Sequence, residues 1–317
     1  SRARLAYIID STSAHICILL LLNGWGAYVL GLLGSYELNQ SAVSILIQTI
    51  PLNFYALITL IIVVYTCWTD KIHGPLKQAE LNQQKSTKKL ELDIPASKPR
   101  YMLLPLITLS VSMVAFMFIT GNGDFIQGSG SKSVLYATTL ACLVAYTMMI
   151  ASKRFNHKKM TEIGFKGIAE LLPLVMIVLF SLALGASLKT LGTGTFISGL
   201  VAENLPLFLV PMVLFLAGGL MSFTTGTSWG TFALLIPIGM PLVINLDLPA
   251  PLLLAAILGG GVFGDHCSPI SDTTAVSAVA SGCDLLEHVR TQLPYALFAG
   301  GLTIVSYIVC GLIFIGL

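Results

Sequence analysis

The chain has 317 residues, of which 55% are hydrophobic and only 10% are charged. Soluble globular domains carry about 25% charged residues, so the composition excludes an ordinary soluble domain and indicates a polytopic membrane protein. The formal net charge of +2 is too small to indicate a nucleic-acid partner. The cysteines are scattered without a C-x-x-C pair, so we expect free thiols rather than a disulfide framework.

Five apolar spans can be recognised in the first part of the chain, because about 20 apolar residues cross a bilayer as a helix. They are predicted at residues 14–34, 45–68 with a bend at Pro51, 101–119, 134–151 and 171–191. The polar stretches 70–100 and 153–170 carry seven and five Lys/Arg against four and two Asp/Glu. The positive-inside rule therefore places both stretches in the cytoplasm, together with the N-terminal end of the chain.

Residues 205–245 are too long for one crossing and short for two. Two apolar halves, 205–221 and 232–244, flank the polar stretch 222–230. This region is predicted to form either two crossings or a re-entrant hairpin with a polar tip. Four residues at that tip, Thr225, Gly226, Thr227 and Ser228, are candidates to approach an ion. The alternative is that their hydroxyls only satisfy backbone groups freed at a helix break.

The apolar run 251–283 is interrupted by Gly-Asp-His-Cys-Ser-Pro-Ile-Ser-Asp-Thr-Thr at 264–274. Ionisable groups inside a membrane span are costly and usually functional. The glycines at 259–261 and Pro269 weaken a helix, so we predict that the span is a broken helix with an unwound middle. A cytoplasmic turn at 284–292 and a last span at 293–317 should follow.

The interrupted stretch offers oxygen ligands of the kind that hard cations such as Na⁺ prefer. Burial makes the charge of a carboxylate costly, and either a bound cation or a proton offsets that cost. We therefore expect Na⁺ at Asp265 and Asp272 in competition with protons. The predicted ion- and proton-binding residues are Asp265, His266, Ser268, Ser271, Asp272, Thr273 and Thr274.

Three of these residues also have a structural interpretation. Asp272 could simply cap the helix that follows it, and Asp265 could form a buried pair with a histidine or lysine. His266 could relay protons, sense pH, or stay neutral in a hydrogen bond. The signature Asp10-Ser11-Thr12 resembles a helix cap ahead of the first span, and Asp10 and Thr12 remain weaker candidates for the ion path.

Two enzyme alternatives arise from the same residues. Gly226-Thr-Ser228-Trp-Gly230 matches G-x-S-x-G, but that motif requires a strand–turn–helix setting, and apolar helical runs flank it here. An intramembrane protease could pair Ser228 with His266, or use Asp265 and Asp272 as facing aspartates. A transition-metal site at Asp265-His266-Cys267 is disfavoured, because neighbouring residues do not readily converge on one ion.

The chain is predicted to divide into segments 1–69, 70–100, 101–191 and 192–317. Arg2-x-x-Leu5-x-Tyr7 recurs as Arg290-x-x-Leu293-x-Tyr295, each at the cytoplasmic start of an apolar span. In transporters such internal repeats place the binding site at broken helices near the midplane.

At these motifs the sequence resembles the NhaC-type Na⁺/H⁺ antiporter family. The segments that carry the resemblance are 5–12, 225–232, 264–274 and 288–295. The resemblance covers the later part of a family member, so an equivalent acidic broken helix is expected upstream of Ser1. It implies inverted repeats and favours the re-entrant hairpin at 205–245.

The resemblance also implies exchange of Na⁺ for H⁺ across a bacterial cytoplasmic membrane. Coupled carriage of a small organic acid or amino acid is the alternative. We therefore expect an all-α polytopic transporter that is not an enzyme, is surrounded by lipid and has no cofactor apart from the transported ions. A homodimer is left open.

Overall fold

The computed structural model describes residues 1–20, 23–84, 98–125, 127–153 and 155–316. Within these residues the elements are helices and no strand occurs, which confirms the all-α prediction. The helices are α1 (Arg2–Leu19), α2 (Gly24–Leu33), α3 (Ala42–Thr49), η1 (Ile50–Leu52), α4 (Phe54–Thr69), α5 (Gly74–Gln84), α6 (Arg100–Thr120), α7 (Gly130–Ala151), α8 (His157–Thr190), α9 (Thr193–Asn204), η2 (Leu207–Leu209), α10 (Val210–Thr225), α11 (Ser228–Leu246), α12 (Ala250–Cys267), α13 (Asp272–Ser281) and α14 (Leu285–Phe314).

Seven helical segments of the described chain are long and apolar enough to cross a membrane. The predicted third and fourth spans are confirmed as α6 and α7. The predicted bend in the second span is the 3-10 turn η1, where Pro51 separates α3 from α4. The polar connector at 70–100 contains the helix α5, and its residues 85–97 lie outside the described residues.

Two predicted loops are helical instead. The stretch 153–170 belongs mostly to α8, which begins at His157 and is 34 residues long. Pairs at i,i+3 and i,i+4, Lys159–Glu162 and Lys166–Glu170, align opposite charges along its exposed side. The predicted turn 284–292 forms the first turns of α14, because the Asp284 side chain caps the backbone amide of Glu287.

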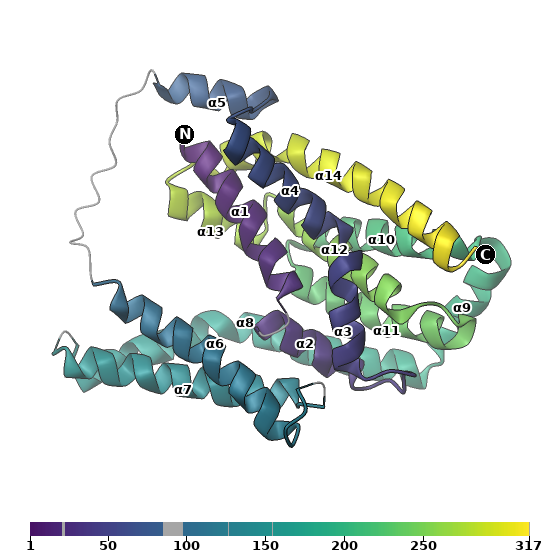
Figure 1. Cartoon of the computed structure of the whole chain (residues 1–317), viewed down its shortest axis with the longest axis horizontal. Coiled ribbons are helices and arrows are strands. Elements are labelled where there is room, and N and C mark those ends of the chain that lie inside the picture. Colours follow the sequence, from purple (N-terminus) through teal and green to yellow (C-terminus); the bar gives the residue numbers. More distant parts are fainter. Residues whose placement is uncertain (21–22, 85–97, 126, 154, 317) are drawn as a thin grey trace. The chain divides into compact units, whose positions relative to one another are not determined.

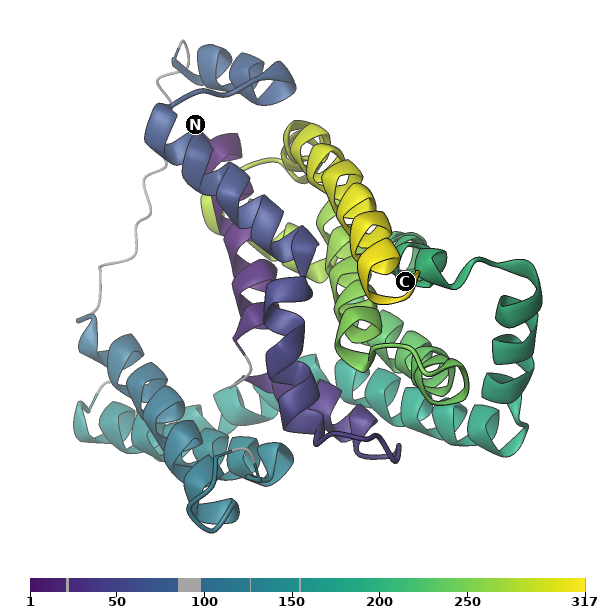
Figure 2. The same cartoon turned by 45° about the vertical axis from the view of Figure 1, so that its right-hand side comes forward.

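Contacts divide the chain into two compact units. Residues 1–20, 45–90 and 181–317 form the first unit, and residues 21–44 and 91–180 form the second. This grouping cuts across the four segments expected from the sequence. In the second unit α6 and α7 pack side by side (Figures 1 and 2). All predicted site residues belong to the first unit.

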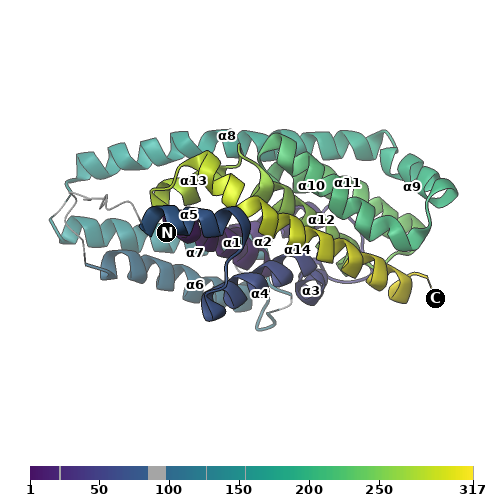
Figure 3. The same cartoon turned by 90° about the horizontal axis from the view of Figure 1, so that it is seen from above.

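The helix α12 forms the core of the first unit, and 83% of it is buried. It contacts α1, α4, α10, α11 and α14, and Figure 3 shows α10 and α11 beside it. The glycines do not break this helix, which continues to Cys267. They allow close packing instead, because a Cβ at Gly260 would lie 2.4 Å from the Phe215 carbonyl oxygen of α10.

The ends that the positive-inside rule places in the cytoplasm lie together in the first unit. The Arg4 guanidinium pairs with Asp70 at the end of α4, and Arg2 Nη1 donates to the Gly282 carbonyl ahead of α14. The rings of Tyr7 and Tyr295, from the two copies of the short repeat, have centroids 4.9 Å apart. This arrangement agrees with the topology expected for these three helices.

Candidate functional site

The predicted broken helix is present: α12 ends at Cys267 and α13 starts at Asp272. Pro269, in the connection between them, cannot donate a backbone hydrogen bond. Ser271 then starts the new helix, because its hydroxyl accepts from the Thr274 amide. The break therefore follows from Pro269 and Ser271, which stand three and one positions ahead of Asp272 at the start of α13.

The connection between α10 and α11 lies against this break. It is a tight turn at Gly226, whose φ of +68° suits glycine. A Cβ at this position would lie 2.7 Å from the Ile270 carbonyl oxygen. The Ser268 hydroxyl donates to the Phe223 carbonyl at 2.8 Å. The region therefore forms two helices joined at this turn, each long and apolar enough to cross a membrane, and the turn packs on the unwound residues. The choice between two crossings and a re-entrant hairpin stays a prediction.

The first polar group at the break is the Asp265 cluster, made of Asp265, Ser228, Thr273 and Ser271. Oδ2 of Asp265 accepts from the Ser228 hydroxyl at 3.0 Å and from the Thr273 hydroxyl at 3.4 Å. Ser271 and Thr273 hydroxyls lie 2.9 Å apart. Asp265 is only 1% exposed, and its Oδ1 has no hydrogen-bond partner among the described residues. The cluster is a buried carboxylate with three hydroxyls drawn from α11, α13 and the residue ahead of α13.

The structure does not bring Asp272 into this cluster. Asp272 occupies the first position of α13, where its side chain is exposed and accepts from the Thr273 amide at 2.8 Å. The first turn of the helix directs this carboxylate outward, while Asp265 points into the core. Ser271 rather than Asp272 provides the N-cap of α13, and binding of Na⁺ by Asp272 together with Asp265 stays a prediction.

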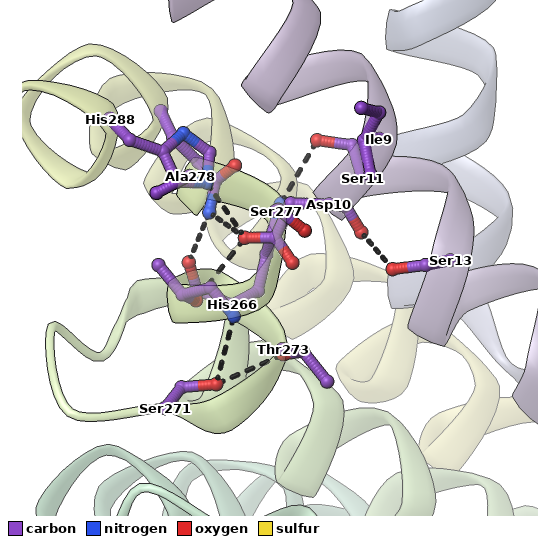
Figure 4. A network of polar contacts seen from close by, with 12 residues as sticks. Ile9, Asp10, Ser11, Ser13, His266, Ser271, Thr273, Ser277, Ala278 and His288 are labelled. Carbon is purple, nitrogen blue, oxygen red and sulfur yellow. Dashed lines mark hydrogen bonds and ion pairs between the residues drawn. The ribbon is translucent and has the colours of Figure 1, made fainter. Parts of the chain in front are cut away.

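The second buried acid is Asp10, the centre of the Asp10 cluster with His288, Gln292 and Thr274. Its Oδ2 accepts from Gln292 Nε2 at 2.7 Å and lies 3.2 Å from both His288 Nε2 and the Thr274 hydroxyl. These partners come from α14 and α13, and Figure 4 shows Asp10 and His288 in this network. The side chains of Asp10 and His288 are 1% and 0% exposed.

Asp10 and Thr12 do not cap a helix as the sequence suggested. α1 begins at Arg2, with Ser1 as its cap, so both residues lie inside it. The Thr12 hydroxyl donates to the carbonyls of Ile8 and Ile9 in its own helix, so its hydrogen bonds stay within α1. Asp10 instead points towards α13 and α14.

His266 adjoins both clusters. Its Nε2 lies 3.0 Å from the Ser11 hydroxyl and its Nδ1 lies 2.7 Å from the Tyr55 hydroxyl. Its carbonyl accepts from Gln292 at 2.7 Å. A neutral imidazole can serve both hydroxyls, with one nitrogen donating and the other accepting.

The same contacts bear on the enzyme alternatives. Ser228 bonds Asp265, whereas the nitrogens of His266 bond Ser11 and Tyr55, so the structure forms no Ser228–His266 pair. The G-x-S-x-G stretch joins α10 to α11, which is not the strand–turn–helix setting that the motif needs.

The other hairpin-tip candidates lie outside the two clusters. Thr225 is exposed and donates to the Met221 carbonyl of its own helix. Thr227 accepts from Thr231 through its carbonyl and is only partly buried. Two predicted residues of the helix break also lie outside the Asp265 cluster. The Ser268 hydroxyl donates to the Phe223 carbonyl of the hairpin, and the Thr274 hydroxyl belongs to the Asp10 cluster.

Sequence reasoning missed His288 and Gln292 because it placed 284–292 in a turn. The signal was present in the spacing, since His288, Gln292 and Ala296 follow each other at i,i+4 and are all buried on one side of α14. Glu287 and Arg290 interrupt this side only in the linear sequence, because they project from other faces of the helix.

Comparisons with known proteins agree with this architecture. The family model described as the Na⁺/H⁺ antiporter family matches residues 17–312. An uncharacterized protein of Haemophilus influenzae is 31% identical over 100% of this chain and 65% of its own length. The malate-2H⁺/Na⁺-lactate antiporter of Bacillus subtilis is 33% identical over 51% of this chain and 35% of its own length.

A further relative, named a Na⁺/H⁺ antiporter of Haemophilus influenzae, is 37% identical over 34% of this chain and 23% of its own length. No solved structure matches the chain significantly. The chain therefore spans 65% of the length of the relative that covers all of it. The family match extends over nearly the whole sequence and includes all of α12 with Asp265, but it begins after Asp10. The chain belongs to the Na⁺/H⁺ antiporter family.

Proposed function

We propose that the protein exchanges Na⁺ for H⁺ across a bacterial cytoplasmic membrane, with Asp265 as the group that both ions share. The observation that carries this proposal is the composition of the Asp265 cluster. A buried carboxylate is surrounded by hydroxyls, and no Lys or Arg among the described residues forms an ion pair with it. Oxygen ligands of this kind suit a hard monovalent cation.

Competition at one carboxylate supplies the coupling. An isolated buried charge is costly, so Asp265 is stable when it carries either a proton or a cation. Na⁺ arriving from the cytoplasm displaces the proton, and a proton arriving from outside displaces Na⁺. Ser228 and Thr273 belong to different elements, so movement of the hairpin against the broken helix would assemble and open the site, as in other transporters with sites at broken helices.

The proposal is tested by reconstituting the protein in proteoliposomes and imposing a Na⁺ gradient. Wild-type protein should drive proton movement that a pH-sensitive dye reports, and Asp265→Asn should abolish it. Asp247→Asn is the matched control, because Asp247 is an exposed acid at the end of α11. Exchange that survives in Asp265→Asn contradicts the proposal.

Coupled carriage of an organic acid is the second candidate function, because one relative is named a malate-2H⁺/Na⁺-lactate antiporter. The same vesicles distinguish the two candidates. Proton movement driven by Na⁺ alone supports simple exchange. Proton movement that appears only after malate or lactate is added supports the coupled carrier.

A further inference from the structure

We propose that Asp10 and His288 form a second, separate proton-binding site, which handles a proton without binding Na⁺. This inference rests on the proposed Na⁺/H⁺ exchange and goes beyond it, because it assigns the proton and the cation partly to different groups. The two sites lie on different elements around the same helix break: Asp265 faces the hairpin, and Asp10 faces α14.

The three donors at Asp10 Oδ2 favour a bare carboxylate over a bound cation at that oxygen. This oxygen already faces Gln292 Nε2, His288 Nε2 and the Thr274 hydroxyl. An amide NH₂ and a neutral imidazole N–H present hydrogens, which repel Na⁺ and stabilise a carboxylate. The Asp265 cluster differs in kind, because hydroxyl oxygens can turn their lone pairs towards a metal ion.

His288 is arranged to accept a proton. A carboxylate only accepts hydrogen bonds, so the contact with Asp10 assigns the hydrogen of the neutral imidazole to Nε2. The other nitrogen, Nδ1, is buried and has no hydrogen-bond partner among the described residues. A proton added at Nδ1 makes His288 a cation beside the Asp10 carboxylate, so a lone buried anion becomes a buried ion pair. A buried carboxylate is tolerated when it is paired in this way.

The two sites share neighbours, so each senses the other. The Thr274 hydroxyl lies 3.2 Å from Asp10 Oδ2 and 3.3 Å from the Asp265 carbonyl oxygen. It carries a single hydrogen and can donate to only one of them at a time. Gln292 similarly links Asp10 to the His266 carbonyl. A change of charge in the Asp10 cluster therefore reaches the last turn of α12, which holds Asp265.

Other titratable groups around this pair come from each packed element. His15 on α1 is fully buried, its ring centroid lies 4.6 Å from that of His266, and neither of its ring nitrogens has a partner among the described residues. α12 contributes Asp265, His266 and the buried Cys267, α4 contributes Tyr55, and α13 contributes the exposed Asp272. On α14 itself Glu287 is exposed. Of these groups, only His288 makes an ion-pair contact with Asp10.

The test counts the protons released when Na⁺ binds to detergent-solubilised protein in weakly buffered solution. Binding of radioactive Na⁺ is measured in parallel, over a range of pH. His288→Gln removes the imidazole nitrogen Nδ1, the proton acceptor of the proposal, and keeps a side chain that can donate to Asp10. Asp10→Asn removes the charge that holds the proton on His288. His73→Gln is the control, because that histidine is exposed ahead of α5.

His288→Gln and Asp10→Asn should both bind Na⁺ at alkaline pH but release fewer protons per Na⁺ than wild type. Their Na⁺ affinity should also depend less on pH, by a factor within the roughly 5–150-fold range typical of coupled sites. Combining the two changes should cause no further loss. His73→Gln should behave as wild type.

Equal proton release and equal pH dependence in wild type and His288→Gln would overturn the separate site. Loss of Na⁺ binding by both variants, while they stay monodisperse and thermally stable, would also overturn it, because the pair would then belong to the cation site. A wild-type protein that releases no protons at all when Na⁺ binds refutes the proposed exchange itself, which separates the two failures.

Discussion

Gly264→Ala tests whether close packing of α10 on α12 holds the Asp265 cluster together. A Cβ at Gly264 would lie 2.1 Å from the Gly219 carbonyl oxygen and 2.7 Å from the Phe223 amide nitrogen. Both are backbone atoms of α10, so no side chain can rotate away. The two helices must move apart by most of an ångström before the methyl group fits.

The net cost follows from two opposing terms. Overpacking of this kind costs about 1–3 kcal/mol, and alanine in a helix gains about 0.5–1 kcal/mol over glycine. The middle values of the two terms therefore leave the variant less stable by about 1 kcal/mol, within a range of about 0–2.5 kcal/mol. The displacement falls next to Asp265 and opposite Ser228, so Na⁺ binding should weaken as well.

Gly301→Ala is the matched control for this change. It is also a glycine within a helix, α14, but a Cβ there would meet no atom within 4 Å. It should keep Na⁺ binding and gain up to about 1 kcal/mol from helix propensity. Stability can be followed by thermal unfolding, read from the loss of helical circular dichroism. Equal stability and Na⁺ affinity in Gly264→Ala and wild type would refute the packing argument.

Three further substitutions extend the account. Ser228→Ala removes a hydrogen bond to a buried carboxylate, worth about 1.5–3 kcal/mol, and should weaken binding of radioactive Na⁺ about tenfold or more; unchanged affinity would remove Ser228 from the site. Gln292→Leu leaves the His266 carbonyl without its donor and should cost about 1–3 kcal/mol in thermal unfolding, whereas Gln292→Glu should be worse because it places a second carboxylate against Asp10. Arg4→Ala removes an ion pair whose acid, Asp70, is 80% exposed, so it should cost at most about 1 kcal/mol and leave exchange in proteoliposomes intact; a large loss would show that this contact does more than join two helix ends.

The sequence predicted the large features of this fold because they depend on local chemistry. Apolar length located α6 and α7, and the polar residues around Pro269 located the break. Asp265 was identified because a carboxylate in an apolar run is costly wherever it points.

The partner of that acid could not be predicted in the same way, because it depends on tertiary packing. Asp265 and Asp272 are close in the sequence, but a helix start between them turns Asp272 outward. Asp10 reaches His288 from the other end of the chain, which no local pattern indicates. The charged residues Glu287 and Arg290 made 284–292 resemble a surface turn, although a helical projection places its polar residues on separate faces.

The most direct test of the account is the affinity of purified protein for Na⁺ as a function of pH. If a cation and a proton compete for Asp265, the dissociation constant for Na⁺ should rise about tenfold for each unit that the pH falls through the range where protons bind. Asp265→Asn should bind Na⁺ negligibly at every pH. A Na⁺ affinity that stays constant as the pH falls, or that survives in Asp265→Asn, would contradict the central claim.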